Sequence, residues 1–466
     1  MARKKKPGTV GELRASGYRV FTVKQEMRRN LIEKIKKNQP LFSGIEGFED
    51  SVIPMMENAL LAGQDIILLG ERGQAKSRLI RQLTSLLDDE VPVIAGCELN
   101  DNPFSPICRA CKDRTADEGD AVEIAWLGRD QRYSEKLATP DISVADLIGE
   151  IDPIRVAEGR YLSDELTIHY GLIPRTNRGI FSINELPDLS ERIQVSLFNL
   201  MEERDIQIKG YRIMLPVDIF LVATANPEDY TNRGRIITPL KDRYGAQIRT
   251  HYPTSLEQEV NIVEQEYVKF PDTARRVTVP QYMKELIAEF TALARRSPEI
   301  NQRSGVSLRV SIANYETLLS NAFKRSLRQK EPASPRISDL PAIAASTTGK
   351  IELESVEEGR ELKVVDDLIR KAVLNTFRRY YEPGEFDGLV ARFGEGLTFE
   401  AGSSLSSALY ADKLASMDGM PEMVRRIESS DKPAAIASAI EFILESLHLN
   451  RRLNRDQLGR TTVYRS

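Results

Sequence analysis

The chain has 466 residues, of which 41% are hydrophobic and 29% are charged, and its formal net charge is −4. This length predicts about three domains, and the weak negative charge argues against nucleic-acid binding through an overall basic surface. No run of about 18 apolar residues is present, so we expect no membrane-spanning segment. The basic N-terminal residues are not followed by an apolar stretch, so we expect no signal peptide and a soluble, cytoplasmic protein. Three cysteines are too few for a disulfide framework.

Residues 1–40 form a charged segment with a helical pattern over residues 23–37. Residues 42–61 read as a short loop followed by a helix. The turn residues Gly44 and Gly47 could flank an adenine ring, or they could simply cap that helix.

The first strong motif is IILLGERGQAKS, residues 66–77. An apolar strand ends at a glycine, and a Lys-Ser pair opens a helical pattern six residues later, as in the phosphate-binding loop G-x-x-x-x-G-K-[ST]. Lys76 is expected to reach the β/γ phosphates of a nucleotide and Ser77 to bind Mg²⁺. Ala75 stands where the second glycine is usual, which is tolerable if its φ angle stays negative. The predicted loop residues are Gly70, Glu71, Arg72, Gly73, Gln74, Ala75, Lys76 and Ser77.

The three cysteines follow a short β-rich run at residues 91–95. Cys108 and Cys111 have the C-x-x-C spacing of metal ligands, with Cys97 as a third thiol. No fourth ligand is evident, so three ordinary small residues are favoured over a zinc site. Residues 109–135 are charged and are expected to form a surface segment.

A helix is expected to begin at Ser143, and residues 151–174 are expected to form an insertion with a hairpin. The second strong motif, GIFSINELPD, follows at residues 179–188. Asn184 and Glu185 stand at the end of its buried strand, where ligands bind in parallel sheets. Glu185 fits the base that orients water in phosphoryl hydrolysis. Asn184 could hydrogen-bond a water of the Mg²⁺ shell but brings no charge; the bland alternative is a helix-capping pair without chemistry.

A helix over residues 191–203 and a hairpin over residues 206–215 come next. Residues 219–224 form a third apolar strand that ends near Asn226, whose amide could reach the γ-phosphate or the attacking water. Residues 232–245 are then rich in arginine.

From about residue 256 the pattern becomes helical and no further group of strands is apparent. Residues 330–341 read as a linker, and residues 362–380 and 433–447 as amphipathic helices. The expected fold is therefore an α/β domain with a parallel sheet, followed by a helical lid and a mainly helical C-terminal extension. The expected boundaries are given by residues 1–40, 41–255, 256–335 and 336–466.

The order of these motifs over residues 40–330 resembles the AAA+ ATPases, in particular the magnesium chelatase I subunit and the MoxR-type ATPases. The segments that carry this resemblance are TNRGIFSINE at residues 176–185, TANPE at 224–228, PLKDRYG at 239–245 and SGVSLRV at 304–310.

The resemblance implies ATP and Mg²⁺ as ligands and assigns further roles. Asn226 corresponds to sensor 1, Arg309 to sensor 2, and Arg243 to an arginine finger that acts on the nucleotide of a neighbouring subunit. A finger supplied in trans implies a ring, most often a hexamer, although Arg243 could instead form a surface ion pair. The resemblance also implies a partner protein with a von Willebrand A (integrin-like) domain.

The first hypothesis is therefore a cytoplasmic ATPase that remodels a partner protein, with a MoxR-like role slightly favoured over metal insertion. A rival is an ATP-binding regulatory or scaffold protein with little hydrolysis because of Asn184. A motor acting on nucleic acid is a weaker alternative, since the expected hairpin at residues 206–215 carries only Lys209 and Arg212 as positive charges.

Overall fold

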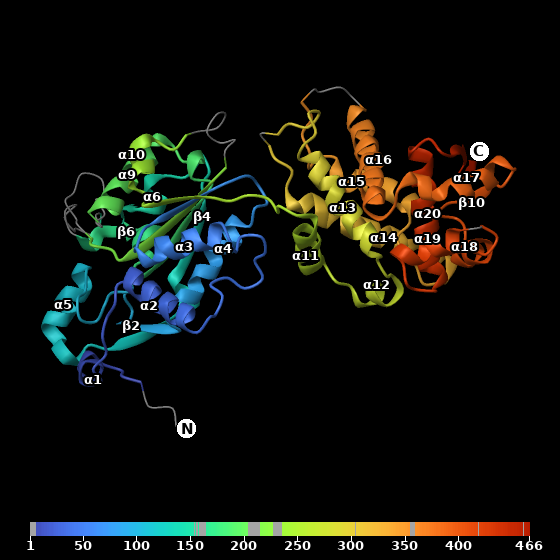
Figure 1. Ribbon diagram of the computed structural model, residues 1–466. Coiled ribbons are helices and arrows are strands. Elements are labelled where there is room, and N and C mark those ends of the chain that lie inside the picture. Colours follow the sequence, from blue (N-terminus) through green and yellow to red (C-terminus); the bar gives the residue numbers. More distant parts are fainter. Residues whose placement is uncertain are drawn as a thin grey trace. The chain divides into compact units, whose positions relative to one another are not determined.

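The computed structural model describes residues 6–152, 154, 157, 165–203, 215–226, 235–302, 304–354, 359–417, 419–459 and 461–466. The chain divides into two compact units, residues 1–251 and 252–466, which are described separately (Figure 1). No helix among the described residues is long and apolar enough to cross a membrane.

A five-stranded parallel sheet forms the centre of the first unit. Its strand order is β4-β7-β8-β1-β9. The bounds are Ile66–Leu69 for β1, Tyr133–Leu137 for β4, Gly179–Asn184 for β7, Ile219–Ala225 for β8 and Ala246–Arg249 for β9. Successive side chains of β1 pack on opposite faces of the sheet: Ile66 and Leu68 belong to one cluster of buried hydrophobic residues, and Ile67 belongs to another. The three central strands are apolar because both of their faces are covered.

Helices cover both faces of this sheet. Residues of α2, α3 and α4 belong to one cluster of buried residues, and residues of α1, α8, α9 and α10 belong to the other. The helices of the first unit are α1 Val10–Ala15, α2 Val23–Lys36, α3 Val52–Leu61, α4 Lys76–Gln82, α5 Arg109–Glu118, α6 Val144–Leu147, α8 Leu172–Arg175, α9 Glu191–Glu202 and α10 Thr238–Arg243.

Two antiparallel pairs are inserted between the elements of the sheet. Strands β2 (Glu90–Ile94) and β3 (Ile124–Gly128) pair across a segment that contains α5. Strands β5 (Gly149–Ile151) and β6 (Ile168–Tyr170) form the second pair. Strand β6 lies within the expected insertion at residues 151–174, whereas β5 begins two residues before it. The expected hairpin at residues 206–215 lies, apart from its last residue, outside the described residues.

The expectation of a surface segment at residues 109–135 is only partly right. Helix α5 is largely exposed, but β4 joins the main sheet. Arg132 is 2% exposed and donates from both terminal nitrogens to the carboxylate of Glu26, at 2.7 and 2.6 Å. Its Nε also donates to the carbonyl oxygen of Arg178. The charged composition of residues 109–135 therefore did not indicate that Arg132 forms a buried ion pair.

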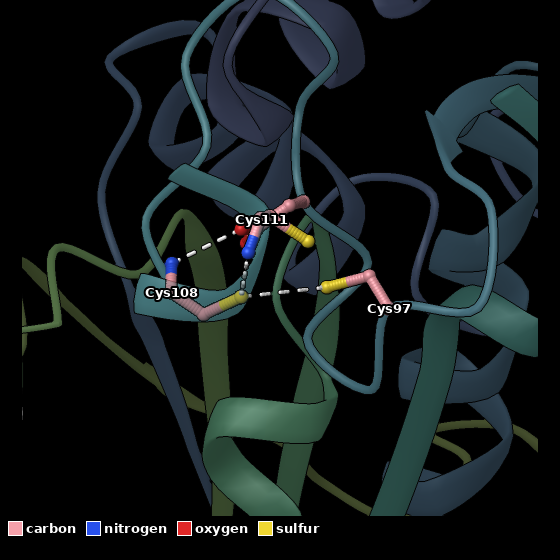
Figure 2. A group of neighbouring side chains, drawn as sticks. Cys97, Cys108 and Cys111 are labelled. Atoms are coloured by element: carbon pink, nitrogen blue, oxygen red, sulfur yellow. Dashed lines mark hydrogen bonds between the residues drawn. The ribbon is translucent and has the colours of Figure 1, made fainter. Parts of the chain in front are cut away.

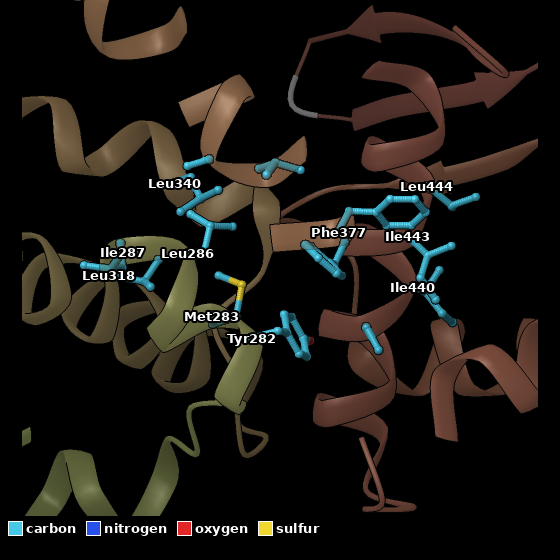
Figure 3. Close-up of a cluster of buried hydrophobic side chains, with 14 of the residues drawn as sticks. Tyr282, Met283, Leu286, Ile287, Leu318, Leu340, Phe377, Ile440, Ile443 and Leu444 are labelled. Carbon is cyan, nitrogen blue, oxygen red and sulfur yellow. The ribbon is translucent and has the colours of Figure 1, made fainter. Parts of the chain in front are cut away.

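The second unit is mainly helical and contains one large cluster of buried hydrophobic residues, from Val263 to Tyr464. Figure 3 shows α13 and α14 side chains, such as Met283 and Leu318, in the same cluster as Phe377 of α16 and Ile440 of α20. The helices are α11 Leu256–Glu266, α12 Pro271–Arg276, α13 Gln281–Ala294, α14 Leu308–Gln329, α15 Ala344–Thr347, α16 Arg360–Tyr380, α17 Asp387–Gly394, α18 Ser407–Leu414, α19 Met420–Ile427 and α20 Pro433–Leu449.

Two expectations for this unit are wrong. A three-stranded antiparallel sheet is present, in the order β10 (Phe399–Ala401), β12 (Thr461–Arg465) and β11 (Asn454–Leu458). The expected linker at residues 330–341 is built into the structure: Arg336 and Asp339 are 0% and 1% exposed, and the backbone N–H of Arg336 donates to Asp339 Oδ2 at 2.8 Å. The finer division into residues 256–335 and 336–466 stays a prediction.

Candidate functional site

The loop after β1 is held closely against the neighbouring strands. The Gly70 N–H donates to the carbonyl oxygen of Ala225 at the end of β8 (3.1 Å). A Cβ on Gly70 would lie 2.0 Å from Thr250 Oγ1 and 2.2 Å from Gln74 Oε1, so no larger residue fits there without a shift. Thr250 in turn donates to Gln74 Oε1 at 2.6 Å, which links the loop to the end of β9. Close packing around Gly70 thus explains why the motif has a glycine at this position.

Ala75 adopts the left-handed conformation, with φ 54° and ψ 13°. The condition under which an alanine was expected to be tolerable here, a negative φ angle, is therefore not met. Gly73 also has a positive φ, of 77°. Left-handed residues next to right-handed ones turn successive backbone N–H groups to one side, which produces a concave anion-binding turn. An alanine in this conformation costs about 1–2 kcal/mol relative to the right-handed region, and the loop retains that cost at the position next to Lys76.

Lys76 begins α4, and its side chain is buried (8% exposed). Its ammonium donates to the carbonyl oxygens of Gly70 and Glu71, the latter at 2.7 Å. It also donates to Asn226 Oδ1 at 2.7 Å. The oxygen atoms of a bound phosphate could replace these three acceptors of the Lys76 ammonium, because they are hydrogen-bond acceptors too.

A continuous chain of polar contacts joins the three strongest sequence motifs. Asn226, 2% exposed, accepts from Lys76 through Oδ1 and donates through Nδ2 to Glu185 Oε2. The backbone N–H of Glu185 donates to Thr224 Oγ1 at 3.0 Å. Glu185 has a φ of 58°, another left-handed residue at the end of a strand. Lys76, Asn226 and Glu185 come from β1–α4, β8 and β7, so the sheet order brings these three predicted residues together.

Asn184 is half-buried, and its Oδ1 lies 3.5 Å from Ser182 Oγ. The side chain of Ser77 is exposed on the first turn of α4. No described contact tests whether Asn184 or Ser77 helps to bind a metal ion, so both roles stay predictions. Thr224 is a participant that the sequence analysis missed, although its position two residues before Asn226 at the end of an apolar strand was a usable signal.

Helix α4 is also anchored at its far end. Arg81 donates to both carboxylate oxygens of Glu135 on β4, at 3.0 and 2.5 Å. The hydrogen bond from Arg81 is the largest cause that lowers the pKa of Glu135. Fixing α4 on the sheet limits how far the Lys76 end of the helix can move.

Arg243 does not contact the loop among the described contacts. It ends α10, and its guanidinium pairs with Glu202 of α9 at 2.8 Å and donates to Pro239 O at 2.7 Å. The same group lies over the ring of Phe198, 4.4 Å from its centroid. Arg243 is therefore held by its own subunit, as the ion-pair alternative anticipated. Arg235 is exposed and lies 3.7 Å from Glu191.

Arg309 lies in the second unit, on the first turn of α14, with its side chain exposed. The backbone N–H of Arg309 donates to Ser307 Oγ, the side chain that caps this helix (3.1 Å). Its sensor 2 role stays a prediction.

The phosphate-loop geometry, the parallel sheet and the mainly helical second unit are features that the resemblance to the AAA+ ATPases predicts. The chain resembles the I subunit of magnesium chelatase within that class. It is 26% identical over 209 residues to the magnesium-chelatase 38 kDa subunit of Acidiphilium rubrum. It is also 26% identical over 266 residues to the magnesium-chelatase subunit ChlI of Nostoc sp., and over 229 residues to a ChlI homolog of Methanocaldococcus jannaschii.

These alignments cover 42%, 55% and 48% of this chain and 54%, 65% and 58% of the respective relatives. The chain thus spans less than two thirds of the length of each of these relatives. No protein-family profile matches the chain. Among solved structures, a chain of the complex between subunits BchI and BchD of magnesium chelatase aligns with 71% of this chain and 98% of its own length, at 19% identity and a TM-score of 0.35. NtrX from Brucella abortus in complex with ATP aligns with 83% of this chain and 72% of its own, at 14% identity and a TM-score of 0.41.

Proposed function

We propose that this protein is a Mg²⁺-dependent ATPase that works as a ring and remodels a partner protein. The chain of contacts Lys76–Asn226–Glu185 carries the proposal, because it links a phosphate-binding lysine to a carboxylate through one buried amide. A general base must lie within hydrogen-bond reach of the water that it activates. In this arrangement the base and the phosphate-binding group are positioned by the same side chain.

Each residue has a distinct task in the proposed reaction. Lys76 leaves the carbonyl oxygens of the loop and binds phosphate oxygens, a contact that offsets charge as the β–γ bond breaks. Glu185 orients the attacking water and accepts its proton. Asn226 holds both side chains at the correct separation, and its amide can hydrogen-bond the water or the γ-phosphate once Lys76 has moved.

The residues present fit a polyphosphate with its metal. The backbone turn at Gly73 and Ala75 offers N–H groups to an anion, and the buried ammonium of Lys76 supplies positive charge beside it. Ser77 and Asn184 would hold the metal and its waters. Mg²⁺ supplies neutralisation of charge on the phosphate oxygens when it is bound.

The proposed ring assembly rests on the expected arginine-finger role of Arg243. An arginine that acts in trans stabilises transition-state charge only when a neighbouring subunit is present, and such a finger is worth about 10³–10⁵ in rate. We therefore propose that assembly frees Arg243 from Glu202 and presents it to the nucleotide of the next subunit. A von Willebrand A domain protein is the proposed partner, and the cytoplasm the proposed location.

Steady-state ATP hydrolysis of the full chain tests this proposal. The Glu185→Gln variant should bind ATP and lose about 10²–10⁴-fold in turnover, the usual contribution of a general base. Glu123→Gln, the same substitution at an exposed position, is the matched control and should keep full activity. Equal turnover in wild type and Glu185→Gln would contradict the role of Glu185.

One observation favours a second function, that of an ATP-binding scaffold. The chain has the amide of Asn184 next to Glu185, where a carboxylate would bind the metal shell more strongly. If ATP binds with no measurable turnover in wild type, and Asn184→Asp creates turnover, the scaffold function is supported and the motor function is contradicted.

A further inference from the structure

A cluster of potential metal ligands lies in the first unit, away from the residues that carry the proposed ATPase. Their ligand atoms lie within 4.8 Å of one another. No other such group of three or more histidine, cysteine or carboxylate side chains is found in the described part of the chain. We call this group the cysteine cluster; it consists of Cys97, Asp101, Cys108 and Cys111.

The three sulfur atoms point toward a common centre (Figure 2). The Sγ atoms of Cys97 and Cys108 are 3.9 Å apart. Tetrahedral zinc with Zn–S bonds of about 2.3 Å places its sulfur ligands about 3.8 Å apart, whereas a disulfide needs about 2.05 Å. The spacing therefore matches ligands that share one metal ion and does not match an S–S bond.

Asp101 is the independent observation that points to a ligand. Its side chain is 0% exposed. Oδ2 accepts from the backbone N–H groups of Ile107 and Cys108, both at 3.0 Å. Oδ1 has no hydrogen-bond partner among the described residues. A buried carboxylate oxygen without a partner is costly, and a metal ion would satisfy it.

Backbone donors support thiolates at this position. The N–H of Leu99 donates to Cys97 Sγ at 3.3 Å, and the N–H of Cys111 donates to Cys108 Sγ at 3.4 Å. Such contacts orient the side chains that bind a metal ion, as do the two N–H groups on Oδ2 of Asp101. A cavity of about 290 Å³, lined by all three cysteines, gives an ion a path to the sulfur atoms.

We propose that the cysteine cluster binds one Zn²⁺ ion as a closed, structural site with three thiolates and one carboxylate. Zinc accepts such ligands in tetrahedral geometry, and four protein ligands leave no position open for substrate. Cys97 and Asp101 lie in the segment after β2, and Cys108 and Cys111 lie at the start of α5. The ion would therefore join the two ends of this loop.

Hydrogen bonds also connect the proposed zinc site with the β5–β6 pair. The backbone N–H of Arg109, next to Cys108, donates to Glu165 Oε1 at 2.8 Å, and Tyr170 of β6 donates to the same oxygen at 3.2 Å. Zinc would thus fix the N-terminus of α5, on which the β5–β6 pair is docked. This role does not depend on ATP hydrolysis.

Metal content of the full chain, purified under reducing conditions with zinc in the medium, is the first measurement. We expect one zinc per chain and three thiols that react with a thiol reagent only after chelation. Replacement of zinc by Co²⁺ should give the visible absorption of tetrahedral cobalt with thiolate ligands. A chain without stoichiometric zinc, or thiols that react equally fast with and without added zinc, would overturn the proposal.

The Asp101→Asn variant tests the fourth ligand. It should weaken zinc affinity by at least the roughly 10–100-fold seen when supporting residues of metal sites are changed. Asp113→Asn, the same substitution at an exposed position on α5, should leave the affinity unchanged. Unchanged affinity in Asp101→Asn would overturn the four-ligand assignment. The cobalt spectrum of the wild-type chain keeps the proposal testable if Asp101→Asn fails to fold. Zinc content does not depend on the nucleotide site, so failure of the ATPase and failure of the zinc site are distinguishable.

Discussion

The ammonium of Lys76 lies 2.7 Å from the side-chain oxygen of Asn226, although the two residues are 150 positions apart in the chain. The contact joins the phosphate loop to the end of β8, and the same amide donates to Glu185. The uncharged side chain of Asn226 thus connects Lys76 with Glu185.

The Asn226→Ala substitution should separate nucleotide binding from hydrolysis. Without the amide, Lys76 keeps its carbonyl partners and can still bind phosphate, whereas Glu185 loses the group that orients it. We expect turnover to fall about 10²–10³-fold, as for loss of a positioned polar group in an active site, with less than a tenfold change in the Kd for ATP. A coupled ATPase assay and a titration with fluorescent ATP measure the two quantities. Asn58→Ala, at an exposed position of α3, is the control; equal losses of binding and turnover in Asn226→Ala would contradict this division of roles.

The Ala75→Gly substitution should stabilise the first unit. Ala75 has a positive φ, which glycine adopts without the steric cost of a Cβ. We expect an increase of about 1 kcal/mol in the free energy of unfolding. Ala62→Gly is the matched control, because Ala62 ends α3 at a φ of −81° and the change there should destabilise by about 0.5–1 kcal/mol. Urea unfolding followed by the fluorescence of Trp126, the single tryptophan of the chain, reports on this unit. The same sign for both variants would contradict the strained loop.

Loss of the buried partner of Arg132 should be strongly destabilising. Glu26→Gln leaves the guanidinium of Arg132 buried without its counter-charge, and breaking a buried pair in this way costs about 3–5 kcal/mol. Asp120→Asn removes the carboxylate of the exposed pair with Arg14 and should cost less than about 1 kcal/mol. The fluorescence-detected urea midpoint measures both changes. If Glu26→Gln were as mild as Asp120→Asn, the ion pair would not be buried in solution.

Mixed assemblies should reveal whether Arg243 acts between subunits. Arg243→Ala and Glu185→Gln should each abolish most ATPase activity. A mixture of the two variants contains interfaces with one intact Glu185 and one intact Arg243 from different subunits, so activity should partly return. Glu202→Gln, which removes the partner of Arg243 within its own chain, serves as control and should remain active. If the mixture assembles and stays as inactive as its components, Arg243 does not complete a neighbouring site.

The sequence was most informative where strands are buried on both faces. Strands β1, β7 and β8 are mainly apolar. Glu185 and Asn226 could be placed at the ends of β7 and β8 from that pattern, and Lys76 from the phosphate-loop motif that follows β1. Strands β4 and β9 were missed because they lie at the edges of the sheet, where polar residues are tolerated. The polar β11 was missed for the same reason.

Contacts between distant segments could not be read from local patterns. Glu26 and Arg132 are 106 positions apart, and each looks like an ordinary surface charge. Asp101 is close in sequence to the cysteines, but aspartate has no fixed place in a C-x-x-C pattern, and its role became visible only through its burial. The left-handed conformation of Ala75 was not predicted from the alanine, although the glycine that is usual at this position of the motif was a signal for a positive φ angle.

The single hydrophobic cluster of the second unit has a mechanical consequence. Because Val310 of α14 and Tyr464 of β12 belong to one packed body, a rotation of α14 cannot be absorbed within that body without breaking its packing. A displacement imposed on the first turn of α14 would therefore be transmitted to the C-terminal sheet. The second unit would then move as one rigid body, without a hinge between α14 and the C-terminal sheet.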